Sequence, residues 1–293
     1  MALPLRVGCV IPARIGSTRL PRKPLIDLHG EPMIVHVWRR ASEALGKENV
    51  MVASDDERVL DAIRRVGGLS CMTDERCASG SARVAQVMQD FSEFASRYTL
   101  VVNVQGDEPL VDPNNIRQLA LMMAGPTRAK FEDGSCVATL ATPIRSWAEY
   151  EDPNCVKVVR RSDSRALYFS RSPIPWVPGQ QRSSDTEHAL LANQNVDSGQ
   201  FLRHVGLYGY SVAFLRNMFQ RGSQMFRQTA LESCERLEQL HWMERGHEIY
   251  VSTVPSASHG VDTADDLLRI SAMQLDAHSR CAAAPLRVGH RHA

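Results

Sequence analysis

The sequence predicts an α/β fold in which a doubly wound, mostly parallel sheet carries helices on both faces. Short, nearly continuous apolar runs predict buried strands at Arg6–Pro12, Val50–Ala53 and Leu100–Val104. Segments with apolar residues at helical spacing alternate with these runs and predict helices at Met33–Ala44, at Asp56–Val66 and within Ser79–Phe94. Such alternation is typical of a parallel sheet, because parallel neighbours are joined by helical crossovers.

The second half of the chain is less regular. Apolar runs predict strands at Cys136–Pro143, Cys155–Arg160, His204–Val212 and Ile249–Val254, and helical spacing predicts helices at Leu231–Arg245 and Thr263–Leu275. Residues 178–199 are rich in Ser, Gln, Asn and Gly, which predicts a long mobile loop or an insertion. We expect one domain over residues 5–276 and a disordered tail over residues 277–293.

Composition narrows the function. The 293 residues include 43% hydrophobic and 23% charged residues and carry a net charge of +1, so no global field favours nucleic acid or an anionic membrane. No apolar run is long enough to span a membrane and the start is not a signal peptide, so we expect a cytoplasmic protein, with organellar association through a partner left open. The seven cysteines form no CxxC pair, which favours reduced thiols over a zinc site.

A basic loop follows the first predicted strand. Residues 11–25 read IPARIGSTRLPRKPL and hold hydroxyl groups, one glycine and four cations: Arg14, Arg19, Arg22 and Lys23. Fixed cations and backbone amides at the end of a strand suit a triphosphate. A solvated surface loop is the alternative, although two prolines stiffen this one. The loop lacks both GK[ST] and GxGxxG, so a P-loop ATPase or a dehydrogenase is poorly supported.

Two aspartates follow predicted strands. Asp107 lies in VNVQGDEP and Asp262 in HGVDTADD. Carboxylates in such places can hold Mg²⁺ against phosphate oxygens during phosphoryl or nucleotidyl transfer. Each could instead cap the helix that follows it.

A further set of polar residues lies in the second half of the chain. Arg171 follows an aromatic strand in ALYFSRSPIP, and His204 and Tyr208 share one face of a strand. Glu238 and Gln239 are expected in the middle of a helix, within LEQL. Taken singly, each also fits a structural role, as a core histidine, a strand tyrosine or a solvated helix face.

Together these motifs resemble one family. IPARIGSTRLPRKPL, NVQGDEP, ALYFSRSPIPW, FLRHVGLYGY, LEQL and HGVDT occur in the order seen in the 3-deoxy-manno-octulosonate cytidylyltransferases, and the resemblance runs from about Val7 to Leu275. It implies a Rossmann-like nucleotidyltransferase fold with a smaller lobe, within about residues 140–245, that forms a homodimer interface and part of the sugar site. It also implies CTP as donor, 3-deoxy-manno-octulosonate (Kdo) as acceptor and Mg²⁺ as cofactor.

The resemblance also assigns residues by position. Arg14, Lys23, Asp107 and Asp262 match the catalytic positions, the two aspartates being the magnesium ligands. The nucleotide-binding positions are Arg14, Ser17, Arg19, Lys23, Ser79, Gly80 and Arg83. The sugar-binding positions are Gln105, Arg171, His204, Tyr208, Glu238 and Gln239. No side chain is assigned as a general base.

The chain departs from the family pattern in three respects, and two alternatives to the resemblance stay open. One departure is length, because residues 178–199 form a longer segment than usual and the tail after Leu275 is extra. An acidic residue usually stands where this chain has Ala82, and a basic Arg or Lys where it has His241. A catalytically silent nucleotide-binding relative is one alternative, which only the change at Ala82 encourages. A CMP-sialic acid synthetase is another, because the shape of the sugar pocket cannot be read from the sequence.

Overall fold

A mixed sheet with helices on both faces organises the chain, as the sequence predicts. The computed structural model describes residues 7–17, 19–176, 201–219, 228–257 and 260–273. The expected loop at 178–199 and tail at 277–293 lie outside these ranges. The strands of the main sheet are β1 Val7–Ala13, β4 Val50–Ser54, β5 Leu69–Met72, β6 Leu100–Asn103, β7 Cys136–Pro143, β8 Lys157–Arg160, β9 Ala166–Ser170, β10 Leu202–Ser211 and β11 Glu248–Thr253.

The sheet is mixed: its pairings are parallel except those of β10 and the antiparallel pairing of β8 with β9. Its order is β11-β7-β10-β6-β1-β4-β5, with β8 and β9 paired beyond β10. Strands β4, β1 and β6 run parallel, as do β7 and β11, but β10 is antiparallel to both β6 and β7. The early residues of β10 therefore lie at the same edge of the sheet as the carboxyl ends of β6 and β7, where doubly wound folds place their ligands.

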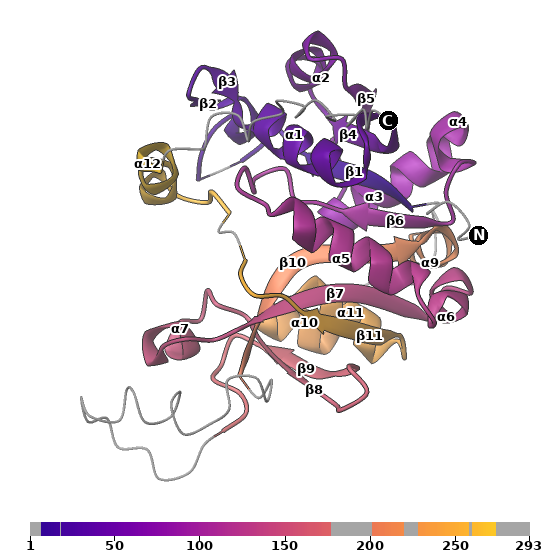
Figure 1. Cartoon of the computed structure of the whole chain (residues 1–293), viewed down its shortest axis with the longest axis vertical. Coiled ribbons are helices and arrows are strands. Elements are labelled where there is room, and N and C mark those ends of the chain that lie inside the picture. Colours follow the sequence, from indigo (N-terminus) through magenta and orange to yellow (C-terminus); the bar gives the residue numbers. More distant parts are fainter. Residues whose placement is uncertain (1–6, 18, 177–200, 220–227, 258–259, 274–293) are drawn as a thin grey trace, which may run out of the picture.

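Helices cover both faces of this sheet (Figure 1). Helices α1, α2, α5 and α6 pack against one face, around core residues such as Ile11 and Ile116, and α3, α4, α9 and α11 pack against the other, around Val10 and Trp242. The helices are α1 Met33–Leu45, α2 Glu57–Arg65, α3 Gly80–Asp90, α4 Ser92–Ala95, α5 Pro113–Ala124, α6 Arg128–Glu132, α7 Trp147–Glu151, α9 Val212–Met218, α10 Ala230–Glu235, α11 Glu238–Glu244 and α12 Ala264–Ala272.

One expected helix is wrong. The sequence predicts a single helix at Leu231–Arg245, but the structure divides it into α10 and α11. Arg236, between them, adopts the left-handed conformation with φ 54°, which ends a helix. Glu238 and Gln239 are therefore in the first turn of α11 rather than in the middle of a helix. Glu238 contacts the start of α3, and Gln239 contacts Tyr208 of β10.

None of the helices in the described part of the chain has the length and apolar character needed to cross a membrane.

Candidate active site

Lys23 brings the basic loop and the two predicted aspartates together. Its Nζ donates to Asp107 Oδ2 at 2.7 Å and to Asp262 Oδ1 at 2.9 Å. Its side chain is 13% exposed, whereas those of Asp107 and Asp262 are 35% and 49% exposed. Burial acts to lower the pKa of Lys23, but the two carboxylates outweigh burial and raise it. The ammonium group is therefore charged at physiological pH.

The backbone explains why these three side chains meet. Strand β1 ends at Ala13 and β6 ends at Asn103, so the residues after each strand reach the same edge of the sheet. Gly106 lets the segments that follow β1 and β6 approach closely, because a Cβ at this position would lie 2.7 Å from the carbonyl oxygen of Pro12. The N–H of Val261 donates to the carbonyl of Asp107 at 2.9 Å, which places Asp262 beside Asp107.

The structure assigns the helix caps to other residues. The N-cap of α5 is Asp112, not Asp107, and the N-cap of α12 is Thr263, not Asp262. The side chains of Asp107 and Asp262 instead pair with Lys23, and Asp262 also pairs with Arg19 at 3.2 Å. Of the two interpretations that the sequence left open for each aspartate, capping is therefore wrong.

Two cavities meet at this acidic pair. The smaller, which we call the loop pocket, has a volume of about 380 Å³ and is lined by the basic loop, the start of α3 and the turn after β6. The larger, the lobe pocket, has a volume of about 1050 Å³ and lies between the ends of β7 and β10 and the loops around α7 and α12. Arg19, Asp107 and Asp262 line both cavities, so they form a shared wall.

Every predicted nucleotide-binding residue lines the loop pocket. These residues are Arg14, Ser17, Arg19, Lys23, Ser79, Gly80 and Arg83. The amino terminus of α3 adds the positive end of an eleven-residue helix, and an anion is favoured there by unpaired backbone amides and by the helix dipole.

The departure at Ala82 concerns this same helix terminus. Ser79 caps α3 by accepting from the N–H of Ala82 at 3.1 Å, which makes Ala82 the third helical residue. An acidic residue there could reach back to the backbone N–H of Ser79 and complete a capping box. Replacing it with alanine removes the possibility of that cap hydrogen bond, while the Ser79 hydroxyl keeps its own.

Glu238 is held beside this terminus. Its carboxylate accepts from Ser79 Oγ at 2.5 Å and from Ser81 Oγ at 2.8 Å, and Ser81 Oγ also bonds the Tyr210 hydroxyl at 2.8 Å. Burial raises the pKa of Glu238, and the two serine hydroxyls only partly oppose it. Glu238 thus links α11 to the start of α3.

His204 is the member of the predicted sugar-binding set that lines the lobe pocket. Its Nε2 lies 2.9 Å from Thr139 Oγ1, and burial lowers the pKa of the imidazole to about 3. The ring is therefore neutral and acts as a hydrogen-bonding group. Its centroid is 5.3 Å from that of Tyr208, whose hydroxyl donates to Gln239 Oε1 at 3.0 Å. Tyr208 and Gln239 are buried behind His204.

The two remaining predicted sugar residues lie elsewhere. Gln105 lines the loop pocket, and its Nε2 donates to the carbonyl of Gly206 at 3.5 Å. Arg171 lines neither cavity. Its guanidinium donates to the carbonyl oxygens of Glu235 at 2.8 Å, of Pro153 at 3.0 Å and of Arg236 at 3.5 Å. Binding of a sugar carboxylate by Arg171 therefore stays a prediction.

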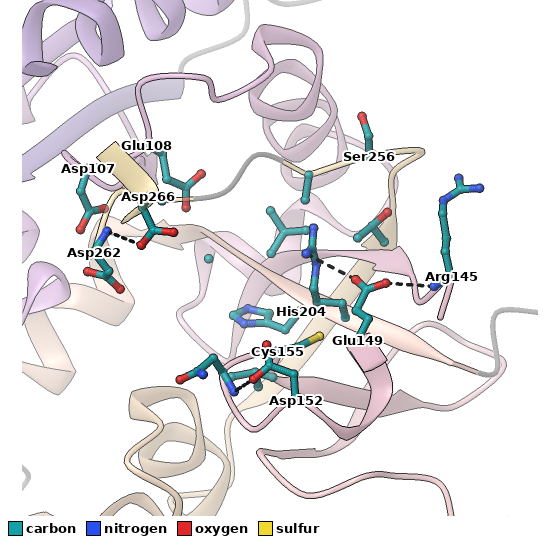
Figure 2. Close-up of a pocket in the computed structure, with 18 of the residues that line it drawn as sticks. Asp107, Glu108, Arg145, Glu149, Asp152, Cys155, His204, Ser256, Asp262 and Asp266 are labelled. Carbon is teal, nitrogen blue, oxygen red and sulfur yellow. Dashed lines mark hydrogen bonds and ion pairs between the residues drawn. The ribbon is translucent and has the colours of Figure 1, made fainter. Parts of the chain in front are cut away.

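The lobe pocket contains charged residues that the sequence reasoning missed. Arg145, Glu149 and Arg203 line it, and Arg203 pairs with Glu149 at 3.4 Å. Figure 2 shows Asp107 and Asp262 at one end of the cavity, Arg145 and Glu149 at the other, and His204 between them. No local pattern marked Arg203, because successive residues of a strand point to opposite faces of the sheet and its neighbour His204 gives no guide to it.

Taken together, the parallel sheet, the basic loop after its first strand, the acidic pair and the helix terminus define an α/β enzyme of the nucleotidyltransferase class. A family model described as cytidylyltransferase matches residues 8–249, and the chain belongs to this family. The resemblance on which the sequence analysis relied is thereby confirmed.

Individual relatives agree with this assignment. A 3-deoxy-manno-octulosonate cytidylyltransferase of Erwinia tasmaniensis is 42% identical over 266 residues, which cover 90% of this chain and 97% of that protein. The enzyme of the same name from Serratia proteamaculans is 41% identical over 262 residues, covering 89% and 96%. A solved CMP:2-keto-3-deoxy-manno-octonic acid synthetase complexed with CTP is 37% identical, covers 91% of this chain and 97% of its own, and superposes with a TM-score of 0.74.

Proposed function

We propose that this chain transfers the cytidylyl group of CTP to the anomeric hydroxyl of 3-deoxy-manno-octulosonate, giving CMP-Kdo and pyrophosphate. The observation that carries the proposal is the shared wall between the two cavities, whose Asp107 and Asp262 are both contacted by Lys23 of the loop pocket. Relatives that match more than nine-tenths of their own length and bear this activity in their names support the choice of substrates.

The loop pocket is suited to the triphosphate of CTP. Arg14, Arg19 and Lys23 supply fixed positive charge, and the start of α3 supplies backbone amides. In the reaction an oxygen–phosphorus bond forms at the α-phosphate while the bond to pyrophosphate breaks. Arg14 and Lys23 stabilise the negative charge that develops on the departing pyrophosphate.

The lobe pocket is suited to the acceptor sugar. His204 is neutral, so it offers a hydrogen bond to a hydroxyl without adding a further cation to the cavity that Asp107 and Asp262 line. Tyr208 packs against the histidine, and Gln239 accepts a hydrogen bond from the Tyr208 hydroxyl. Arg171 is proposed for the sugar carboxylate, and it would have to exchange its carbonyl partners for that group. Arg203, which already lines the cavity, is the competing candidate.

The acidic pair fits Mg²⁺. Within the described residues no group of three or more His, Cys, Asp or Glu is arranged to hold a metal. Mg²⁺ in nucleotide sites, however, is usually held by one or two carboxylates together with substrate phosphates and water. Asp107 and Asp262 contact one lysine nitrogen and so lie within reach of one cation. When bound, Mg²⁺ would neutralise phosphate charge and lower the pKa of the attacking hydroxyl.

Pyrophosphate release tests the proposal. The chain, Mg²⁺ and CTP should release pyrophosphate when Kdo is added, and ATP or UTP should not replace CTP. Release with sialic acid but not with Kdo would move the acceptor assignment to a nine-carbon acid sugar. A folded chain that binds CTP and releases nothing with either sugar would overturn the proposed reaction in favour of a silent nucleotide-binding relative.

The homodimer is also a proposal. The smaller lobe exposes large apolar side chains, Leu167 at 57% and Trp176 at 80%. Light scattering should give twice the mass of one chain, and the mass of a single chain would refute the dimer.

A further inference from the structure

A buried ion pair lies directly behind the loop pocket. Asp55 follows β4, and Oδ2 of its carboxylate accepts from the Arg83 guanidinium at 3.1 Å. The side chains of Arg83 and Asp55 are only 3% and 8% exposed, so solvent screens this pair far less than it screens the surface pairs of the chain. Asp55 does not line either cavity.

The other carboxylate oxygen of Asp55 holds the basic loop. Oδ1 accepts from the backbone N–H of Ile15 at 2.9 Å. Ile15 follows Arg14 directly and begins a tight turn, in which the N–H of Ser17 donates to the carbonyl of Ile15 at 2.9 Å. A single carboxylate therefore connects the loop that carries Arg14 and Ser17 to helix α3, which carries Arg83.

The remaining contacts of Arg83 show that its guanidinium is already hydrogen-bonded within the protein. One terminal nitrogen donates to Thr73 Oγ1, and the other donates to Asp55. Thr73 is itself buried and is fixed by its N–H, which donates to the carbonyl of Ser54 at 2.8 Å. Although Arg83 lines the loop pocket, its guanidinium is paired with an anion, whereas Arg14 has no such pair among the residues that the structure describes.

We propose that Asp55 is a positioning residue for nucleotide binding. It holds the backbone of the basic loop at Ile15 and uses Arg83 as its buried counterion, so that Arg83 acts through Asp55 rather than as a phosphate ligand. This inference rests on the proposed function, because it concerns the pocket assigned to CTP. It departs from the direct nucleotide contact that the family resemblance implies for Arg83.

The two roles for Arg83 predict opposite effects of removing the Asp55 charge. If Arg83 binds phosphate directly, Asp55→Asn frees a cation and CTP should bind more tightly. If Asp55 positions the loop, the same change leaves the Arg83 charge buried without its partner, which disfavours the arrangement seen here. The loop loses its register with α3, and small displacements of binding groups have large effects on rate.

The experiment measures CTP binding and steady-state kinetics for wild type, Asp55→Asn, Asp55→Ala and Arg83→Lys. We expect KM for CTP and the calorimetric Kd for CTP to rise about tenfold in Asp55→Asn. The rise should be larger in Asp55→Ala, which also loses the acceptor for Ile15. KM for Kdo should change less than threefold. Arg83→Lys keeps the positive charge, so its KM and Kd for CTP should rise less than those of Asp55→Ala. This variant still tests the inference if the alanine variant does not fold.

Glu132→Gln serves as the control for loss of an ion pair outside both cavities, because Glu132 pairs with Arg128 on α6. Tighter CTP binding in Asp55→Asn, or a lower Tm with unchanged KM and Kd for CTP, would overturn the inference. Failure of the wild type to bind CTP would instead overturn the proposed function, so the two failures can be told apart.

Discussion

Replacing Lys23 with methionine is the sharpest test of the site. The substitution keeps the length and much of the packing of the side chain but removes the ammonium group, which contacts both Asp107 and Asp262. The Lys23 side chain is largely buried, and Arg19, the other cation at the pair, contacts Asp262 from an exposed position. Loss of this charge has two effects. It leaves the two carboxylates of the free pocket without their shared counterion, and it removes a positive charge that stabilises the departing pyrophosphate.

The first effect is repulsion between the two carboxylates. Their oxygens contact the same nitrogen, so they lie within about 6 Å of each other, and at an effective dielectric constant of about 20 their repulsion is about 3 kcal/mol. Both carboxylates are more than a third exposed, so screening by solvent reduces this to about 1–3 kcal/mol. The second effect is the loss of a preorganised charge on the departing pyrophosphate, which typically costs about 10²–10³ in kcat.

The assay is continuous detection of pyrophosphate with saturating Kdo and Mg²⁺. We expect kcat of Lys23→Met to fall at least about 100-fold. Lys130→Met is the matched control: Lys130 lies on α6 beside Tyr250 and outside both cavities, and its loss should change kcat less than twofold. A folded Lys23→Met enzyme that keeps more than a tenth of the wild-type kcat would refute the role given to this lysine.

Three further predictions concern the aspartates, Arg171 and Glu238. Asp107→Ala and Asp262→Ala should each abolish turnover with little change in circular dichroism, because neither residue caps a helix; near-normal activity of a folded Asp107→Ala variant would argue against the metal assignment. Arg171→Ala should raise KM for Kdo about tenfold with kcat less affected, and an unchanged KM would favour another cation for the sugar carboxylate. Burial raises the pKa of Glu238, so its favourable contribution to stability is complete below about pH 4 and is lost as pH rises through the raised pKa. Glu238→Gln should therefore leave Tm nearly unchanged at pH 4 and raise it at pH 8, and equal changes at both pH values would contradict this.

The sequence predicted the sheet well because its strands are buried on both faces. β1, β4 and β6 are runs of apolar residues with no exposed position, and such runs can be recognised without knowing their neighbours. The basic loop and the two aspartates could be found for a related reason. Each follows a recognisable strand, and the carboxyl ends of parallel strands meet at one edge of the sheet.

The features that the sequence did not predict depend on contacts between distant segments of the chain. The break between α10 and α11 results from a left-handed Arg236, a conformation that propensity does not predict for arginine. The pairing of Arg83 with Asp55 joins residues 28 positions apart, and no local pattern marks it. Arg171 points to backbone carbonyls rather than to the cavity, although its place in a motif suggested a ligand contact. Side-chain direction is decided by tertiary packing, which a motif does not record.

The shared wall between the cavities has a consequence for how the enzyme could be redesigned. Apart from Asp262, the loop pocket takes its lining from residues 12–107, whereas most of the lining of the lobe pocket comes from residues 142–269. On the proposed assignment of the two cavities, donor and acceptor recognition are encoded largely in separate stretches of the gene. A library confined to codons 142–257 could change which acid sugar is accepted while the nucleotide half stays untouched. A chimera joined after residue 108 would exchange most of the lining of the lobe pocket between relatives in one step, together with Asp262 of the shared wall.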